Sequence, residues 1–301
     1  MIIGHSSVYQ TLEAAIKQQH HHALLLAGPK GVGKATTAKS VAIQTLAALS
    51  YQPFNIVEQQ CLSGAYPNYI YVTKLVDEDG KPKNDITVEQ IRNLLSSLKL
   101  KSAYDAPRFV IIDAIDQLNR QAANALLKML EEPPSNTFFL NICHQVSGVL
   151  TTVRSRCLML NFKSLNNHDL ENVVSNNEQQ FSIEIANIAN GSPGYYMAIQ
   201  NAGGEGILQE IEKLLKITNL SDIKTASQEI LKNTDDTFIL EILHQILYQK
   251  ALTQPNVYAN SAHAVEHFLR FTHATYIDAA QRICAAILLA QNPSQQQLIY
   301  G

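Results

Sequence analysis

Hydrophobic and polar positions alternate in two different ways along the chain. Up to about residue 162, short apolar runs of strand length are separated by stretches of helical periodicity, an order typical of a parallel sheet covered by helices. Beyond that point only helical periodicity remains, so the pattern predicts an α/β domain followed by helices. Five strands of a parallel sheet are expected near residues 23–27, 69–73, 109–113, 137–142 and 157–162.

Glycines divide the helical part of the chain. Residues 203–206 read Gly-Gly-Glu-Gly, which favours a linker over a helix. We therefore predict three parts: an α/β domain over residues 1–163, a small helical domain over residues 164–203 and an all-helical domain over residues 204–301. The third part contains a wide apolar stripe that we expect to be buried. It consists of Ile239, Leu240, Ile242, Leu243, Ile246 and Leu247.

Charge and cysteine content narrow the classes of function. The net charge of −3 gives no overall attraction to nucleic acid, so a contact with DNA would need a local basic patch or a partner. The four cysteines lie far apart, which argues against a disulfide framework and against a zinc site. No run approaches the ~20 apolar residues of a membrane span, and the N-terminus lacks the pattern of a signal peptide. We expect a cytoplasmic protein with no membrane contact.

A glycine-rich loop is the strongest chemical signal. Residues 28–35 read Gly-Pro-Lys-Gly-Val-Gly-Lys-Ala and lie between an expected strand and an expected helix. In this context the backbone N–H groups of the loop and the helix N-terminus favour a bound phosphate. The motif therefore predicts a nucleotide site, a P-loop. Its phosphate contacts are Gly28, Gly31, Gly33 and Lys34.

The magnesium-binding part of this site is incomplete. Ala35 stands where a Ser or Thr hydroxyl would hold the ion. Thr36 carries the nearest hydroxyl, but one step along a helix turns a side chain by about 100° from the required direction. Asp113 ends the apolar run at residues 109–113 and fits the second magnesium contact of such proteins.

Two further motifs identify a family. Residues 124–134 read Asn-Ala-Leu-Leu-Lys-Met-Leu-Glu-Glu-Pro-Pro, and residues 155–157 read Ser-Arg-Cys. With the P-loop they resemble the bacterial clamp-loader branch of the AAA+ family, and within it the delta-prime subunits of DNA polymerase III; the resemblance extends from residue 3 to residue 293. It implies an AAA+ P-loop domain with a five-stranded parallel sheet, a small helical lid and a helical collar domain, over the three ranges given above.

The resemblance also implies a role for Arg156. The Ser-Arg-Cys motif of the family carries an arginine finger, which reaches the γ-phosphate bound by a neighbouring tau/gamma subunit. Active relatives have a catalytic glutamate where this chain has Ala114, and a sensor-2 arginine where it has Gly194. Together with Ala35, these losses predict a non-hydrolysing subunit that requires no cofactor. The implied partners are tau/gamma and delta subunits and, through the assembly, the sliding clamp and primer-template DNA.

Other interpretations stay open at this point. The chain could hydrolyse ATP itself as a tau/gamma-like ATPase, with Thr36 and Asp116 as substitutes for the missing groups, or it could bind ATP without hydrolysing it. Arg156 could pair with a local carboxylate instead of serving a neighbour. Three basic side chains could contact DNA or face solvent. They are Arg92, Lys99 and Lys101.

A zinc site is not expected. Many relatives hold zinc through four cysteines between the P-loop helix and the second strand, whereas residues 50–68 contain only Cys61. We expect this segment to be held by the packing of its apolar side chains instead. Those are Tyr51, Phe54, Ile56 and Val57.

Overall fold

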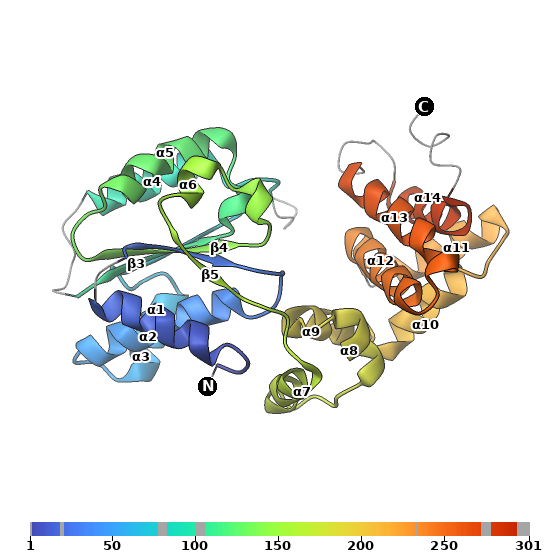
Figure 1. Cartoon of the computed structure of the whole chain (residues 1–301), viewed down its shortest axis with the longest axis horizontal. Helices are drawn as coiled ribbons and strands as arrows, with labels where there is room; N and C mark the ends of the chain where they lie inside the picture. The colour runs from blue at the N-terminus through green and yellow to red at the C-terminus, as the bar shows by residue number, and fades with distance from the viewer. Residues whose placement is uncertain are drawn as a thin grey trace. The chain divides into compact units, whose positions relative to one another are not determined.

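The chain folds into two compact units. The computed structural model describes residues 2–18, 21–77, 83–99, 106–232, 234–271 and 278–293. The first unit is Met1–Asp169 and the second is Leu170–Gly301 (Figure 1). The finer division into three parts, with a boundary near residue 203, stays a prediction.

A five-stranded sheet forms the centre of the first unit. All neighbouring strands in it are parallel, in the order β2-β3-β4-β1-β5. The predicted parallel sheet is confirmed, and each strand lies within one residue of its expected bounds. The strands are β1 (Ala23–Ala27), β2 (Tyr69–Thr73), β3 (Arg108–Asp113), β4 (Thr137–Cys143) and β5 (Leu158–Asn161).

Helices cover both faces of the sheet (Figure 1). Because successive strand residues point to opposite faces, each strand contributes to two cores. On β3, Phe109 and Ile111 pack with α1 to α3, while Val110 and Ile112 pack on the other side. Burial on both faces explains the continuous apolar runs that mark the strands in the sequence. On one face lie α1 (Ser6–Gln18), α2 (Lys34–Leu49) and α3 (Phe54–Leu62), and on the other α4 (Val88–Leu98), α5 (Arg120–Glu131) and α6 (Thr151–Arg154).

Local sequence signals set the ends of several helices. α4 begins with a capping box, in which the side chains of Thr87 and Gln90 accept each other's backbone N–H groups. It ends at Leu98. α5 begins after Asn119, whose side chain accepts the N–H of Ala122 at 2.8 Å. Short 3₁₀ helices, η1 (Ile115–Gln117) and η2 (Val146–Gly148), follow β3 and β4.

The packing predicted for the segment between α2 and β2 is wrong in part. Val57 and Cys61, one turn apart on α3, are buried against the core. Tyr51, Phe54 and Ile56 are exposed instead. Tyr51 precedes the helix, and a helix of nine residues presents one narrow face, so it cannot bury all of these apolar side chains at once.

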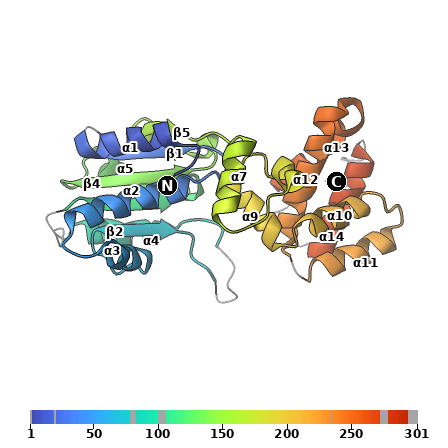
Figure 2. The same cartoon turned by 90° about the horizontal axis from the view of Figure 1, so that it is seen from below.

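Beyond β5 the described chain is helical apart from connecting turns. In the second unit α12 lies against α13 and α14 (Figure 2). The predicted apolar stripe lies on α12 and is buried, as expected. None of the helices in the described ranges is long and apolar enough to cross a membrane. The bounds are α7 (Asn167–Asn176), α8 (Ile183–Ala189), α9 (Pro193–Asn201), α10 (Glu205–Leu214), α11 (Leu220–Ile230), α12 (Asp236–Thr253), α13 (Pro255–Phe271) and α14 (Ala279–Gln291).

Of the three glycines expected to form a linker, Gly203 and Gly204 lie between α9 and α10, whereas Gly206 lies within α10. Gly203 and Gly204 have φ angles of 119° and 61°. Other residues rarely adopt such angles, so the turn between these two helices depends on glycine.

Candidate functional site

The residues of the predicted nucleotide site meet at one edge of the sheet. β1, β3 and β4 are neighbouring parallel strands, so the segments that follow their carboxyl ends lie side by side. These segments are the P-loop after β1, Asp113 at the end of β3 and the turn after β4. The N–H of Gly28 donates to the carbonyl of Cys143 at 3.2 Å, which joins the P-loop to the end of β4.

The geometry of the P-loop requires its glycines. Gly31 and Gly33 have φ angles of 79° and 103°, and Gly33 is the N-cap of α2. Gly28 is required by close approach, because a Cβ there would lie 2.2 Å from the carbonyl oxygen of Phe162. Positive φ angles explain two of these glycines and close packing explains the third.

Lys34 is turned into the loop itself. The residue is 2% exposed, and its Nζ donates to the carbonyl oxygens of Gly28 at 2.6 Å and Pro29 at 2.5 Å. Burial lowers the pKa of Lys34 to about 8, because a buried ammonium loses its hydration. A bound phosphate would have to replace these bonds to the loop.

The first expected magnesium contact is absent. The side chain of Ala35 packs against the core between α2 and the sheet. Thr36 is exposed, and Thr37, the next hydroxyl, is buried and donates to the carbonyl of Gly33 at 2.9 Å. The Thr37 hydroxyl is therefore committed to the helix backbone.

The second expected contact, Asp113, is engaged by a tyrosine. The Oη of Tyr71, on the neighbouring β2, donates to Oδ2 of Asp113 at 2.5 Å. Burial and this hydrogen bond raise the pKa of Tyr71, so its hydroxyl remains a donor. Lys39 of α2 lies over the tyrosine ring, with Nζ 4.2 Å from the ring centroid. An alanine at position 35 and a hydrogen-bonded Asp113 do not fit a magnesium ion held as in P-loop NTPases.

The other carboxylate near the site holds two turns together. Ala114, where active relatives have a glutamate, is buried. Both carboxylate oxygens of Asp116 in η1 accept backbone N–H groups, from His144 at 2.9 Å and from Gln145 at 3.0 Å. Burial, reinforced by the positive charge of Lys34, lowers the pKa of His144. Asp116 thus joins the turn after β3 to the turn after β4, which does not suit a base acting on water.

Arg156 follows α6 and pairs with a carboxylate of the same chain. Its guanidinium forms an ion pair with Glu131 at the end of α5, and its Nη1 donates to the carbonyl of Thr152 at 2.7 Å. The local pairing that the sequence left open is therefore present. The arginine side chain is still 33% exposed, so it reaches the surface of the first unit.

The residue after Arg156 anchors this motif to the sheet. The Sγ of Cys157 accepts a hydrogen bond from Nδ2 of Asn141 on β4, at 3.8 Å. Burial raises the pKa of Cys157 to about 11, so the thiol stays protonated at neutral pH. The motif is thus held at two points, Arg156 by Glu131 of α5 and Cys157 by Asn141 of β4.

The remaining predicted residues lie elsewhere. Gly194 is exposed near the N-terminus of α9, in the second unit. Arg92 and Lys99 are exposed on α4 and at its end, and Lys101 lies outside the described residues. Cys61 is buried in α3, and within the described ranges no three His, Cys, Asp or Glu side chains are grouped as metal ligands.

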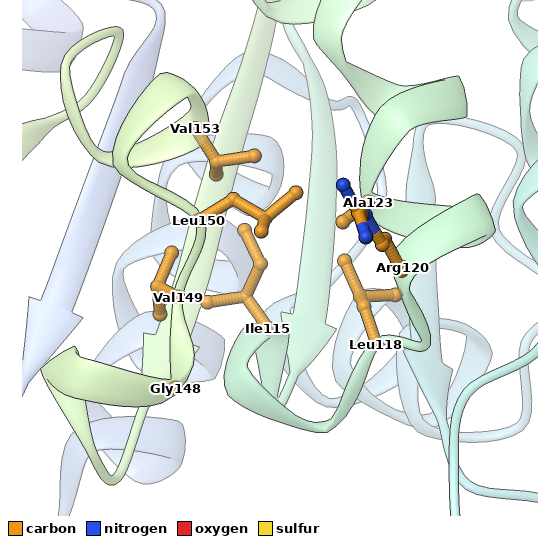
Figure 3. Close-up of a pocket in the computed structure, with 8 residues that line it drawn as sticks. All are labelled: Ile115, Leu118, Arg120, Ala123, Gly148, Val149, Leu150 and Val153. Carbon is orange, nitrogen blue, oxygen red and sulfur yellow. The ribbon is translucent and has the colours of Figure 1, made fainter.

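A small pocket shares no residue with the predicted nucleotide site. Its volume is about 190 Å³, and side chains from η1, α5 and the segment from η2 to α6 converge on it (Figure 3). The lining is mostly apolar and includes Ile115, Leu118 and Leu150, with Arg120 as its charged member. No motif marked this pocket in the sequence, because its lining comes from three separate segments.

Sequence reasoning also missed Tyr71, Lys39 and Glu131. None of them belongs to a nucleotide-binding motif. The signal that was available for Tyr71 is positional, since it shares a sheet face with Asp113 once β2 and β3 are known to be parallel neighbours. For Glu131 the available signal was its place in the segment at residues 124–134, a segment that had served only to indicate the family.

Comparison with known proteins agrees with the motifs. The family model described as "DNA polymerase III, delta subunit" matches residues 4–166. The curated DNA polymerase III subunit delta' of Pseudomonas aeruginosa is 30% identical over 215 residues, which is 66% of this chain and 63% of the relative. The subunit tau of Bacillus subtilis is 26% identical over 263 residues, covering 82% of this chain and 46% of the relative. The chain thus spans less than two thirds of the length of these two relatives.

A solved structure shares the fold. The DNA polymerase III gamma subunit-related protein from Thermotoga maritima aligns with a TM-score of 0.55 at 14% identity, over 95% of this chain and 99% of that one. The predicted AAA+ P-loop architecture with a helical C-terminal region is confirmed. Because the family model covers more than half of the chain, the protein belongs to the DNA polymerase III delta-subunit family, and its predicted resemblance to the delta-prime subunits is confirmed.

Proposed function

We propose that the chain is a non-hydrolysing clamp-loader subunit with the delta-prime role, and that it supplies Arg156 in trans to the ATP site of a neighbouring tau/gamma subunit. One observation carries the proposal. The chain's own site has alanine in place of the magnesium-binding hydroxyl at position 35 and of the catalytic glutamate at position 114, while Arg156 reaches the surface of the same unit. Such a subunit contributes to hydrolysis only at an interface.

The chemistry of an arginine finger suits the arrangement around Arg156. A guanidinium carries five N–H donors, and the bonds to Glu131 and Thr152 use only part of them. The remaining donors can meet the γ-phosphate of a neighbour, where positive charge stabilises the transition state. Arginine fingers contribute about 10³ to 10⁵ in rate, or roughly 4 to 7 kcal/mol of barrier.

The proposed partners follow from the family. They are the tau/gamma and delta subunits, with the sliding clamp and primer-template DNA met through the assembly, in the cytoplasm. In this proposal residues 1–163 form the AAA+ base, residues 164–203 a helical lid and residues 204–301 a collar that joins the other subunits. No cofactor is required and no zinc is expected. ATP bound without hydrolysis stays compatible with the retained P-loop.

A second candidate function is a tau/gamma-like ATPase. It is favoured by the match to a subunit named tau over 82% of this chain, and by the intact glycines and Lys34 of the P-loop. Against it stand the exposed position of Thr36 and the engagement of both Asp116 oxygens. The two candidates differ in where ATP is hydrolysed.

Reconstitution with tau/gamma and delta subunits tests the proposal. DNA-stimulated ATPase activity and clamp loading are measured with the wild-type chain, with Arg156→Ala and with Arg154→Ala. Arg154 is a matched control, because it is exposed two residues away in the same segment. We expect Arg156→Ala to lower the ATPase rate of the complex strongly and Arg154→Ala to leave it near the wild-type rate.

Two results would contradict the proposal. One is an Arg156→Ala complex with wild-type ATPase and clamp-loading rates. The other is ATP turnover by the isolated chain that survives Arg156→Ala and disappears with Lys34→Ala, which would support the tau/gamma-like ATPase.

A further inference from the structure

Tyr71 and Asp113 meet because of the register between β2 and β3. The strands are parallel, with Tyr71 beside Ile111 and Thr73 beside Asp113. Since side chains alternate along a strand, Tyr71 and Asp113 point to the same face of the sheet, the one covered by α2. Tyr71 lies two residues before the strand partner of Asp113, and its long phenol spans this offset to donate to Oδ2 at 2.5 Å.

The ring of Tyr71 is held in place by its surroundings. It packs against the core between the sheet and the helices of that face. Lys39 of α2 covers the ring, with Nζ 4.2 Å from the centroid. The packed ring therefore holds the hydroxyl in a fixed direction, toward Asp113.

Tyr71 engages one of the two carboxylate oxygens of Asp113, the residue expected to make the second magnesium contact. P-loop NTPases hold the ion through a hydroxyl of the loop and an acidic residue on a neighbouring strand. Position 35 no longer supplies the hydroxyl, and the phenol of Tyr71 competes with magnesium, or with water bound to it, for Asp113. Magnesium loses its water ligands reluctantly and tolerates little change in geometry, so a fixed donor at this point is a strong competitor.

We propose that Tyr71 excludes magnesium from Asp113 and acts as a second obstacle to the metal, independent of Ala35. The inference deepens the proposed function, since it rests on the chain's own site being unable to hydrolyse ATP. It assigns to Tyr71 a role that determines which ligands the P-loop accepts. Restoring the hydroxyl at position 35 alone does not restore a metal site, and removing the phenol hydroxyl alone does not either.

The test is a comparison of four full-length proteins: wild type, Ala35→Thr, Tyr71→Phe and the double variant. Tyr71→Phe keeps the ring beneath Lys39 and removes only the hydroxyl. Each protein is titrated with a fluorescent ATP analogue, once with excess Mg²⁺ and once with EDTA. The magnesium dependence is the ratio of the two dissociation constants. We expect a ratio near one for the wild type and both single variants, and a ratio of about tenfold or more for the double variant.

A fifth protein tests whether any gain in magnesium dependence comes from the carboxylate of Asp113. Adding Asp113→Asn to the double variant removes the charge that would hold the ion, so the ratio returns to near one. Thermal unfolding of all five proteins shows whether each is folded, and Mn²⁺ binding in the presence of ADP, followed by electron paramagnetic resonance, reports the metal site directly.

Three outcomes would overturn the inference. Ala35→Thr alone could show the full magnesium dependence, which would make Tyr71 irrelevant. The folded double variant could show no gain in metal dependence by either method. The gain could persist with Asp113→Asn. None of these outcomes bears on Arg156, whose role is tested by the ATPase rate of the assembled complex.

Discussion

Glu131 holds the guanidinium of Arg156 at the junction of α5 and α6. The ion pair links residues 25 positions apart and brings together the two segments by which the family is recognised. In the proposed function, this carboxylate would orient the guanidinium before a neighbouring subunit binds.

This pairing predicts a kinetic effect of Glu131→Gln. Without the charge, Arg156 loses its orientation but keeps its own charge, so we expect the kcat of the reconstituted complex to fall by about tenfold with little change in KM for ATP. Because the pair is partly exposed, the free energy of unfolding of the isolated chain should change by no more than about 1 kcal/mol.

Glu132→Gln is the matched control for this experiment. It removes the same charge from the next residue, which lies at the C-cap of α5 and is exposed. Its complex should keep the wild-type kcat, and Glu131→Asp should restore part of the lost rate. A rise in kcat with Glu131→Gln would show that the carboxylate restrains the arginine and does not position it.

Lys34 predicts that stability rises with pH. Its pKa is about 8 in the folded chain, below its ordinary value of 10.5. Between these values the unfolded chain binds a proton that the folded chain does not, so stability increases as pH rises. Relative to Lys34→Met, the wild type should gain about 2 kcal/mol of unfolding free energy between about pH 7 and about pH 9.5. Urea denaturation of both proteins measures this difference. A constant or falling difference would contradict the lowered pKa.

Gly28→Ala should destabilise the fold. The added methyl group would lie 2.2 Å from the backbone carbonyl oxygen of Phe162, which cannot move aside as a side chain can. We expect the free energy of unfolding to fall by more than about 2 kcal/mol, measured by thermal unfolding.

Gly206→Ala is the control. Its Cβ would meet nothing within 4 Å, and because Gly206 lies in helix α10, the substitution should raise the free energy of unfolding by about 0.5 to 1 kcal/mol. Equal effects at both glycines would disprove the close approach at Phe162.

Asp116→Ala should loosen the turn after β4. It leaves the N–H groups of His144 and Gln145 without their acceptors, so we expect the free energy of unfolding to fall by about 1 to 3 kcal/mol. Hydrogen exchange at these two amides should become faster. Asp85→Ala, at an exposed aspartate, should change stability by less than about 0.5 kcal/mol. Unchanged exchange at His144 and Gln145 would show that Asp116 does not hold this turn.

The sequence predicted the sheet well because its strands are buried on both faces. A continuous apolar run such as Phe109 to Ile112 indicates a buried strand when turns and helical periods flank it. The packing of α3 was predicted wrongly because apolar content alone does not say which face of a short helix meets the core. Phe54 and Ile56 are apolar and exposed, whereas Val57 and Cys61 are buried.

The candidate site was predictable where a motif fixes it and not elsewhere. The glycines and Lys34 follow from the loop pattern, and Asp113 follows from its place at the end of a strand. The contact of Tyr71 with Asp113 joins residues 42 positions apart through the register of two strands. No local pattern encodes such a register, so the partner of Asp113 emerges only from the folded chain.

The bonds from Lys34 to the carbonyls of Gly28 and Pro29 have a consequence for assembly. A P-loop that depends on bound phosphate for its order changes shape as its ligand comes and goes. Here the Lys34 ammonium bonds to the loop itself, so in the proposed assembly we expect the loop to keep one shape while neighbouring subunits bind and release ATP. The subunit would then give the ring a fixed reference surface while the other members move.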